Sequence, residues 1–464
     1  MRGAALTMNA DHLDGDALGP RPWFLLSLLM TAMVFSIVDR QVLALLVEPI
    51  KADLALSDTQ LSLLLGPAFV SFYLLFGLPF GWAADRFQRR YVIALGIGVW
   101  SIATITCGLA SSFLVLVCAR ALVGAGEASL TPSSMSMLSD VFSREQMPFV
   151  TSVLSIAMHI GAASALLIGG AVLSLVGENG VHFPIIGIVS AWQATFLTVG
   201  LPGLALVLVF ASIREPLRTS PTGTEQSESA LSEATKVLGI GQFYVMHRLT
   251  LNVHISVAAL LTICTYAFVS WTPAYLIRVH AYDTESAALA LGVVSLIFGP
   301  LGAIGGGALT RHLQQHRGRV DAAWLVMAAS AFGACVFGAL AFLSTTRAPM
   351  LVGLVLAILF GSLYLGVVHG SLQMITPTPL KGRMSAIMLL AMTGVGTALA
   401  PVLVALLTDQ VFADPQRVGD SIAVVAGSAG VLAGTLLLRS LESFQRSYYG
   451  LDTTQRPQSP GDQQ

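Results

Sequence analysis

Long apolar stretches separated by short polar segments recur along the whole chain. A helix that crosses the hydrocarbon core of a membrane needs about 20 predominantly apolar residues, and twelve stretches of this chain are long enough. They lie near residues 22–46, 58–84, 91–111, 113–138, 148–176, 190–213, 250–277, 285–310, 320–343, 348–375, 384–408 and 420–439. The pattern therefore predicts an all-α membrane protein with twelve transmembrane helices.

One polar segment is longer than the others and divides the spans six and six. Residues 214–249 are rich in Ser, Thr, Glu and Pro, a composition that buries no core and is typical of a linker. We therefore expect an N-terminal six-helix bundle over residues 1–213, a cytoplasmic linker over 214–249 and a C-terminal six-helix bundle over 250–464. Two bundles joined by a long central loop are typical of transporters that work by alternating access.

Charged residues are scarce. The 24 Lys and Arg and 25 Asp and Glu residues make up 11% of the 464 residues, where an average soluble protein has about 25%, and the mean hydropathy is +0.77. This number of charges is too small to cover the surface of a soluble protein of this size. We therefore expect the surface to face membrane lipids. A net charge of −1 disfavours nucleic acid as a partner. The four cysteines lie within apolar runs without a C-x-x-C pair, so we expect no metal and no cofactor.

The basic residues are distributed unevenly between the two sides that the twelve spans define. Lys and Arg accumulate in cytoplasmic segments of membrane proteins. If both termini are cytoplasmic, eighteen of the 24 basic residues lie in inside segments. The outside loops hold Lys51, Arg278, Arg347 and Arg417, and the spans hold Arg40 and Arg120. We therefore expect an integral protein of the inner (cytoplasmic) membrane with both termini in the cytoplasm.

Four charged residues lie inside predicted spans, where each costs about 2.5–3.5 kcal/mol on insertion scales. Asp39 and Arg40 end the first span, and Arg120 and Glu127 lie on the fourth. Arg120 and Glu127 are seven residues apart and share a helix face. Asp39 and Arg40 point about 100° apart on a helix, so their partners come from the fourth span or from a ligand.

These charges have two interpretations. One is a web of buried ion pairs that only fixes helix packing. The favoured one is a proton-coupled carrier, because a buried carboxylate exchanges a proton when an arginine beside it moves. In that interpretation Asp39 and Glu127 are the proton-coupling residues, and Arg40 and Arg120 contact an anionic substrate.

Three further residues are candidate substrate contacts. Tyr275, at the end of the seventh span, either lines a cavity or serves as an interfacial aromatic residue. Tyr364 and His369 lie within the tenth span. A histidine in an apolar span is also typical of a hydrogen-bonded packing residue, so that alternative stays open for His369.

The loop after the second span carries a recognisable pattern. Its sequence GWAADRFQRR, over residues 81–90, resembles the G-x-x-x-D-R-x-x-R-R/K signature of the major facilitator superfamily. The resemblance implies two six-helix bundles and a conformational latch made by Asp85, Arg86, Arg89 and Asp140. Asp85 would lie at the start of the eleventh span, near residues 384–385, where the positive helix end favours an anion. Arg89 would reach Asp140. The alternative is that the basic residues of this loop only determine topology.

Three shorter runs narrow the resemblance. They are IVDRQ at residues 37–41, RALVGAGEAS at 120–129 and WTPAYL at 271–276. Together they look like spinster-type transporters, which are implicated in moving lysophospholipids, sphingosine phosphate and related amphipathic lipids. The resemblance implies that the partners of this chain are an amphipathic lipid substrate and protons.

Other function classes fit the sequence less well. The chain has no H-E-x-x-H, G-x-S-x-G or glycine-rich phosphate-loop motif, so we expect a membrane transporter and no enzyme. A receptor or scaffold has no reason to keep four charges at membrane depth. We expect a monomer. The alternative substrate is a small organic anion or drug.

Overall fold

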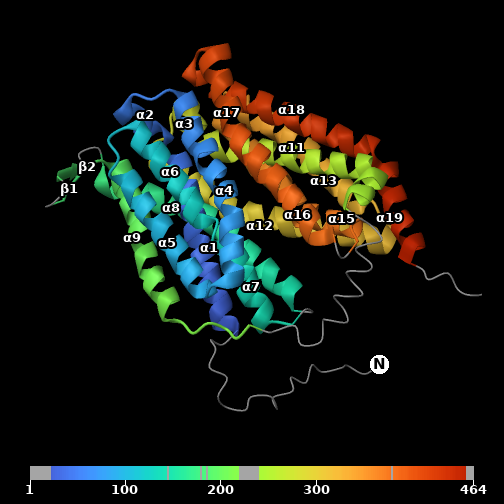
Figure 1. Cartoon of the computed structure of the whole chain (residues 1–464). Coiled ribbons are helices and arrows are strands. Elements are labelled where there is room, and N and C mark those ends of the chain that lie inside the picture. Colours follow the sequence, from blue (N-terminus) through green and yellow to red (C-terminus); the bar gives the residue numbers. More distant parts are fainter. Residues whose placement is uncertain are drawn as a thin grey trace, which may run out of the picture.

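The computed structural model describes residues 22–143, 146–177, 180–183, 187–218, 240–377 and 380–455. In these ranges twelve helices are long and apolar enough to cross a membrane. They form two bundles, with the blue-to-green helices on one side of Figure 1 and the yellow-to-red helices on the other. The predicted all-α fold of twelve spans in two six-helix bundles is confirmed.

Six spans and a small hairpin make up the N-terminal bundle. Its helices are α1 (Pro22–Leu45), α2 (Val47–Leu54), α3 (Asp58–Leu65), α4 (Pro67–Arg86), α5 (Arg89–Gly108), α6 (Phe113–Glu127), α7 (Leu130–Val141), α8 (Met147–Val176) and α9 (Ala191–Ser212). The second span is made of α3 and α4, and the fourth of α6 and α7. Between α8 and α9, β1 (Val181–Phe183) pairs antiparallel with β2 (Gly187–Val189).

The C-terminal bundle has more irregular helices. They are α11 (Ile240–His280), α12 (Thr284–Arg317), α13 (Ala322–Phe342), α14 (Arg347–Ser362), η1 (Leu363–Gly366), α15 (Val368–Met374), α16 (Lys381–Leu390), η3 (Ala391–Thr397), α17 (Ala398–Leu406), η4 (Leu407–Phe412), η5 (Pro415–Arg417), α18 (Val418–Arg439) and α19 (Leu441–Gln455). The eleventh span runs from α16 to η4, and its segments η3 and η4 are π-helical. Such bulges are frequent at functional sites.

The predicted linker is partly helical. Since α11 begins at Ile240, residues 240–249 belong to a helix, which kinks at His247 (φ −111°, ψ 18°). Residues 219–239 of the predicted linker lie outside the described residues.

The C-terminal helix α19 was not expected from the apolar pattern. It docks on the turn between α12 and α13, where Gln445 donates to Asp321 Oδ2 at 3.0 Å and Arg319 donates to both carboxylate oxygens at 3.0 and 2.8 Å. The Arg319 guanidinium holds the pKa of Asp321 below its ordinary value. This contact is therefore stabilising at neutral pH, and its stabilisation is lost when acid protonates Asp321.

The two bundles pack together at one end. We call this the α2/α3 end, and the opposite end, which holds the turn between α4 and α5, the α4/α5 end. At the α2/α3 end one buried apolar cluster includes Leu46 and Leu64 of the first bundle and Trp271 and Val404 of the second. Toward the α4/α5 end the buried apolar residues form a separate cluster in each bundle, apart from Ala398 in the first. The molecule is therefore closed at the α2/α3 end.

The basic residues are also divided between the α2/α3 end and the α4/α5 end. The four predicted outside residues, Lys51, Arg278, Arg347 and Arg417, belong to helices or turns of the α2/α3 end. Of the predicted inside set, Arg2, Arg21, Arg144, Lys236 and Arg456 lie outside the described residues. The sequence-based topology thus predicts that the α2/α3 end is the outer one.

Single cysteines test this topology in a variant whose four native cysteines are replaced by alanine. Thr346 and Gln315 are exposed at the α2/α3 and α4/α5 ends, respectively. We expect an impermeant maleimide to label Thr346→Cys in intact cells, and to label Gln315→Cys only after permeabilisation. The reverse pattern would contradict the proposed orientation.

Candidate functional site

Arg40 and Glu127 form an ion pair between α1 and α6. Arg40 Nη2 donates to Glu127 Oε2 at 2.7 Å, and the Ser36 hydroxyl donates to the same oxygen at 2.7 Å. The Glu127 side chain is fully buried, whereas the Arg40 side chain is 17% exposed. The partner that the sequence predicts for Arg40 on the fourth span is therefore Glu127. The pair joins a buried carboxylate to a cation that a ligand can reach.

Arg120 is placed differently. It is 1% exposed, and its guanidinium donates to two backbone carbonyls, Asp39 O at 3.1 Å and Leu64 O at 3.4 Å. These bonds tie α6 to α1 and α3. The sequence predicts both arginines as substrate contacts, but this burial supports that role only for Arg40.

Each of the four charged side chains keeps one atom without a hydrogen bond to the described part of the protein. These atoms are Asp39 Oδ1, Arg40 Nε, Arg120 Nη2 and Glu127 Oε1. Buried polar atoms nearly always have partners, and an unpartnered group in a low-dielectric interior is costly. The cluster can therefore accept further protons or hydrogen-bonding ligands.

An aromatic ring that the sequence analysis did not single out lies between the two arginines. The ring centroid of Phe69, on α4, is 4.4 Å from Arg40 Cζ and 5.5 Å from Arg120 Cζ. Tyr73 stacks on Phe69 at 5.6 Å and also lies 5.4 Å from Arg40 Cζ. Cation–π contacts of this kind are worth about 2 kcal/mol or more when desolvated. The i, i+4 spacing places both rings on one helix face, but no sequence signal says what that face meets.

Gly124 makes this arrangement possible. A Cβ at Gly124 would lie 2.2 Å from the Phe69 carbonyl oxygen. Only glycine therefore lets α6 approach α4 closely enough to bring Arg120 and Phe69 into contact.

The other three candidate contacts do not join this cluster. Tyr275 is 1% exposed, and its hydroxyl donates to Ala341 O at 2.8 Å, so it packs inside the C-terminal bundle. The Tyr364 hydroxyl lies 3.3 Å from Thr265 Oγ1 in the same bundle, and His369 is exposed on α15. Their identification as substrate contacts rested on span position alone, which does not say which way a side chain points.

Tyr266, on α11 of the C-terminal bundle, is partly buried and packs against the apolar cluster that both bundles share. The sequence analysis did not select it.

Around the α4–α5 turn, Arg89 pairs with Asp140, the partner that the family resemblance implies. Arg89 Nε also donates to Glu215 Oε1 at 2.7 Å. The Glu215 carboxylate further accepts the backbone N–H groups of Arg89 and Arg90 at 3.1 and 3.0 Å, which caps α5. All these residues belong to the first bundle or directly follow it. The contacts of this network among the described residues therefore lie within the first bundle and the segment that follows it, and they hold that bundle together.

Asp85 does not make its predicted contact in this conformation. Its side chain is exposed, and its carboxylate has no hydrogen bond or ion pair with any residue that the structure describes, including the start of α16. Arg86 lies over the ring of Trp82, with Cζ 4.6 Å from the centroid. Within the part of the chain that the structure describes, neither Asp85 nor Arg86 bridges the bundles.

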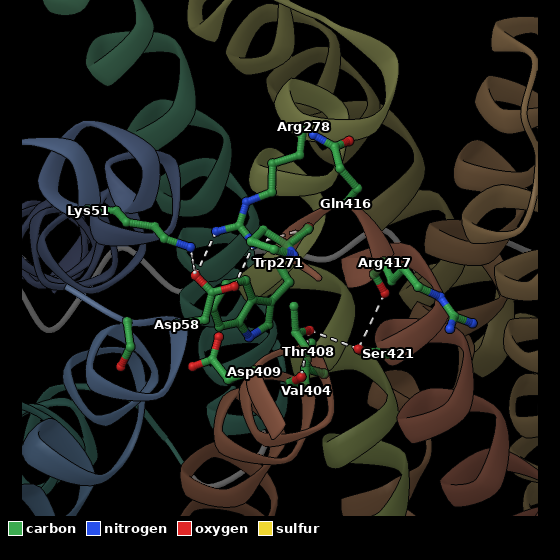
Figure 2. A network of polar contacts seen from close by, with 12 residues as sticks. Lys51, Asp58, Trp271, Arg278, Val404, Thr408, Asp409, Gln416, Arg417 and Ser421 are labelled. Carbon is green, nitrogen blue, oxygen red and sulfur yellow. Dashed lines mark hydrogen bonds and ion pairs between the residues drawn. The ribbon is translucent and has the colours of Figure 1, made fainter. Parts of the chain in front are cut away.

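In the described ranges, polar contacts join the bundles at two places of the α2/α3 end, and the first is a set of ion pairs made by Arg278. Figure 2 shows Arg278 of α11 directed at Asp58 of α3. Its Nη1 and Nη2 lie 2.6 and 2.8 Å from the two Asp58 oxygens, and its Nε lies 2.8 Å from Glu48 Oε1. Lys51 Nζ reaches Asp58 from the same bundle at 2.5 Å. The Asp58 side chain is fully buried, so it holds two cations from opposite sides of the interface.

The second contact is a helix cap. The Asp409 carboxylate of η4 accepts the backbone N–H of Thr59 at 2.7 Å and the Thr59 hydroxyl at 2.8 Å. Sequence reasoning missed this contact and the Asp58–Arg278 pair, because residues more than 200 positions apart in the chain carry no pairing signal in one sequence.

The arrangement supports binding of an anion and exchange of a proton. Among the described residues, no group of three or more His, Cys, Asp or Glu side chains is placed to hold a metal ion.

Comparisons with known proteins agree with this geometry. The sequence model of the Major Facilitator Superfamily matches residues 24–401. An "MFS-type efflux pump" of Mycolicibacterium smegmatis is 24% identical over 420 residues, covering 89% of this chain and 90% of the relative. The "sphingosine-1-phosphate transporter SPNS2" of Danio rerio is 27% identical over 349 residues, covering 71% of this chain and 64% of the relative.

One solved structure shares the fold over nearly the full length. A bacterial homologue of the human lysosomal transporter Spinster, in an inward-facing and unoccupied conformation, aligns with a TM-score of 0.76 at 23% identity. The alignment covers 95% of this chain and 99% of that one. The resemblance to spinster-type proteins is thereby confirmed.

The different placement of the two arginines predicts different losses on substitution. We expect Arg120→Met to lower the free energy of unfolding by about 3–5 kcal/mol, because it leaves buried carbonyls and carboxylates without their cation. We expect Arg40→Met to cost less, because the partly exposed Arg40 is next to a carboxylate that can be neutralised by a proton. Thermal unfolding of both purified variants in detergent provides the measurement. Equal losses would contradict the assignment of Arg120 as the packing residue.

Proposed function

The chain belongs to the Major Facilitator Superfamily, and from that premise we propose that it is a proton-coupled transporter of an amphipathic lipid with an anionic headgroup. The family establishes the coarser statement: the protein is an integral membrane transporter with two six-helix bundles. The cargo, the proton and the orientation are the proposal.

The observation that carries the proposal is the pair of Arg40 and Glu127. Glu127 is fully buried and holds Arg40 at 2.7 Å, while Arg40 keeps 17% of its side chain exposed. An anionic headgroup that reaches the exposed part of Arg40 competes with Glu127 for the same cation. A carboxylate that loses its partner in a buried site is strongly destabilised as an anion and becomes neutral by binding a proton. Anion and proton therefore load together.

Asp39 is the second proton-coupling residue in this proposal. It is 1% exposed, its Oδ1 has no hydrogen-bond partner among the described protein atoms, and it lies within electrostatic range of Glu127 and Arg120. The protonation of either carboxylate therefore alters the field at the other. Arg120, held by the Asp39 carbonyl, keeps both carboxylates close to a positive charge.

The lipid cargo is supported by the neighbours of Arg40. Phe69 and Tyr73 surround its guanidinium with aromatic surface, which suits a ligand whose charged head is attached to an apolar tail. The relative from Danio rerio is named for sphingosine-1-phosphate, a lipid of this chemistry. A small organic anion or drug is the second candidate. It is favoured by the Mycolicibacterium relative that is named an efflux pump and is matched over 90% of its length.

We further propose that the α2/α3 end faces outward, so that the described conformation is open toward the cytoplasm. The excess of Lys and Arg predicted for the other side supports this orientation. In this proposal the bundles over residues 1–213 and 250–464 rock as units around the central cluster, and a monomer is sufficient for transport.

The proton role is tested by Glu127→Gln in proteoliposomes, with a fluorescent lysophosphatidylglycerol as the probe. We expect the wild type to move the probe faster when a pH gradient is imposed. The variant, which cannot exchange the proton, should lose this acceleration but still bind the probe, because glutamine fills the same space. Glu442→Gln is the matched control, since the Glu442 side chain is 83% exposed.

The outcomes separate the two candidate cargoes. If the wild type ignores the lysolipid but moves a small organic anion with the same gradient dependence, the second candidate replaces the first. If Glu127→Gln moves its cargo at the wild-type rate with full gradient dependence, the proton role is wrong, and the charges only fix packing.

A further inference from the structure

The second and eleventh spans lie against each other and run in opposite directions. The second begins with α3 at the α2/α3 end and finishes at Arg86, while the eleventh begins with α16 at the α4/α5 end and finishes with η4. The two are in close contact at Gly66, where a Cβ would lie 2.6 Å from Ala398 O and 3.0 Å from Pro401 Cγ. The eleventh span therefore ends beside the beginning of the second at the α2/α3 end, while the second ends at the α4/α5 end, where the eleventh begins.

Each of these spans also carries an aspartate near its C-terminal end. Asp409 lies in η4 and Asp85 next to the last residue of α4. A helix N-terminus has unpaired N–H groups and a partial positive charge, so it is the natural partner for a carboxylate. The antiparallel arrangement puts the start of a helix of the opposite bundle at the same end of the molecule as each aspartate.

At the α2/α3 end this contact is made. Ser57 caps α3 through a capping box, in which its hydroxyl accepts the N–H of Gln60 and the Gln60 side chain accepts the N–H of Ser57. The box leaves the N–H of Thr59 without a partner in its own bundle. Asp409 accepts this N–H at 2.7 Å and the Thr59 hydroxyl at 2.8 Å. The second bundle thus completes the cap of a helix in the first.

At the α4/α5 end the corresponding contact is not made. The Asp85 side chain is exposed and has no partner among the residues that the structure describes. Among the described residues the buried apolar clusters toward that end are separate apart from Ala398, whereas one cluster spans both bundles at the α2/α3 end. Asp409 thus has a partner at the closed α2/α3 end, whereas the Asp85 side chain has none among the described residues at the α4/α5 end.

We propose that Asp409 is a functional residue of the transport cycle, and that Asp409 and Asp85 cap the opposing helices alternately. The Asp409–Thr59 cap holds the α2/α3 end closed. When that end opens, the cap is released, and Asp85 caps the start of α16 instead. The inference rests on the proposed function only in that it requires two alternating conformations.

The ion pairs around Asp58 allow the α2/α3 end to open without leaving the Asp58 carboxylate unpaired. Arg278 comes from the second bundle and leaves with it, but Lys51 belongs to the same bundle as Asp58 and lies 2.5 Å from it (Figure 2). The buried Asp58 carboxylate therefore keeps one cation after Arg278 has gone. Without Lys51, opening would leave an unpaired buried charge.

Distances between spin labels at both ends test the exchange without a known substrate. One pair, Ala52→Cys with Thr345→Cys, spans the bundles at the α2/α3 end. A second, Ser139→Cys with Gln315→Cys, spans the α4/α5 end; all four residues are exposed. Both pairs are introduced into the full chain without native cysteines, in lipid nanodiscs, with and without the fluorescent lysophosphatidylglycerol.

The two aspartates should act in opposite directions. We expect Asp409→Asn to raise the population open at the α2/α3 end by about five- to thirty-fold relative to the closed one, because a neutral amide is a weaker cap. Asp85→Asn should lower that population by a similar factor. Asp409→Glu, which keeps the charge, should restore part of the closed population. Asp420→Asn is the matched control, because Asp420 lies at the same end and pairs only with Arg417 of its own bundle among the described residues.

Failure of the inference and failure of the proposed function give different results. If the wild type shows both populations but Asp409→Asn matches Asp420→Asn, the exchange of caps is overturned and alternating access is untouched. If the wild type keeps one distance at each end under all conditions, alternating access itself is overturned, and the exchange with it.

Discussion

A charge inside a membrane protein must keep a partner, and this constraint shapes the centre of the molecule. Glu127 is fully buried and forms an ion pair with Arg40, and Arg120 donates hydrogen bonds to the carbonyls of Asp39 and Leu64. Both guanidinium groups also lie near the ring of Phe69. Because Gly124 has no side chain, α6 and α4 come close enough for these contacts. The packing of the first bundle thus follows from where its charges find partners.

The two bundles contribute unequally to the chemistry. All four intramembrane charges of the cluster belong to the first bundle, which can hold them without help from the second. The second bundle supplies groups that meet the first across the interface, Arg278 and Asp409 at the α2/α3 end. A rigid first bundle that carries the cluster and a second bundle that closes over it is consistent with alternating access.

Sequence reasoning succeeded where the signal is local. Run length was sufficient for the twelve spans, and helical geometry excluded an Asp39–Arg40 pair. It left the fourth span or a ligand as the source of a partner for Arg40, and the structure has Glu127 there. Sequence reasoning does not reach the contacts that depend on tertiary packing. Tyr275 was a plausible lining residue by position, but its hydroxyl bonds to Ala341 inside one bundle. The contacts of Phe69 and Asp409 depend on which helices lie side by side, and apolar spans have too little periodicity to reveal that.

The closed end combines strong and exchangeable interactions. A carrier needs two conformations within a few kcal/mol of each other, so neither end can be closed by contacts that are costly to break. The apolar cluster at the α2/α3 end is non-directional and favours closure broadly. The polar contacts can be replaced when this end opens. Asp58 keeps Lys51 when Arg278 leaves, and water can take the place of Asp409 at the Thr59 N–H. These polar contacts therefore set the register of closure between α3 and η4, and their contribution to closure is small enough for the contacts made at the opposite end to offset it.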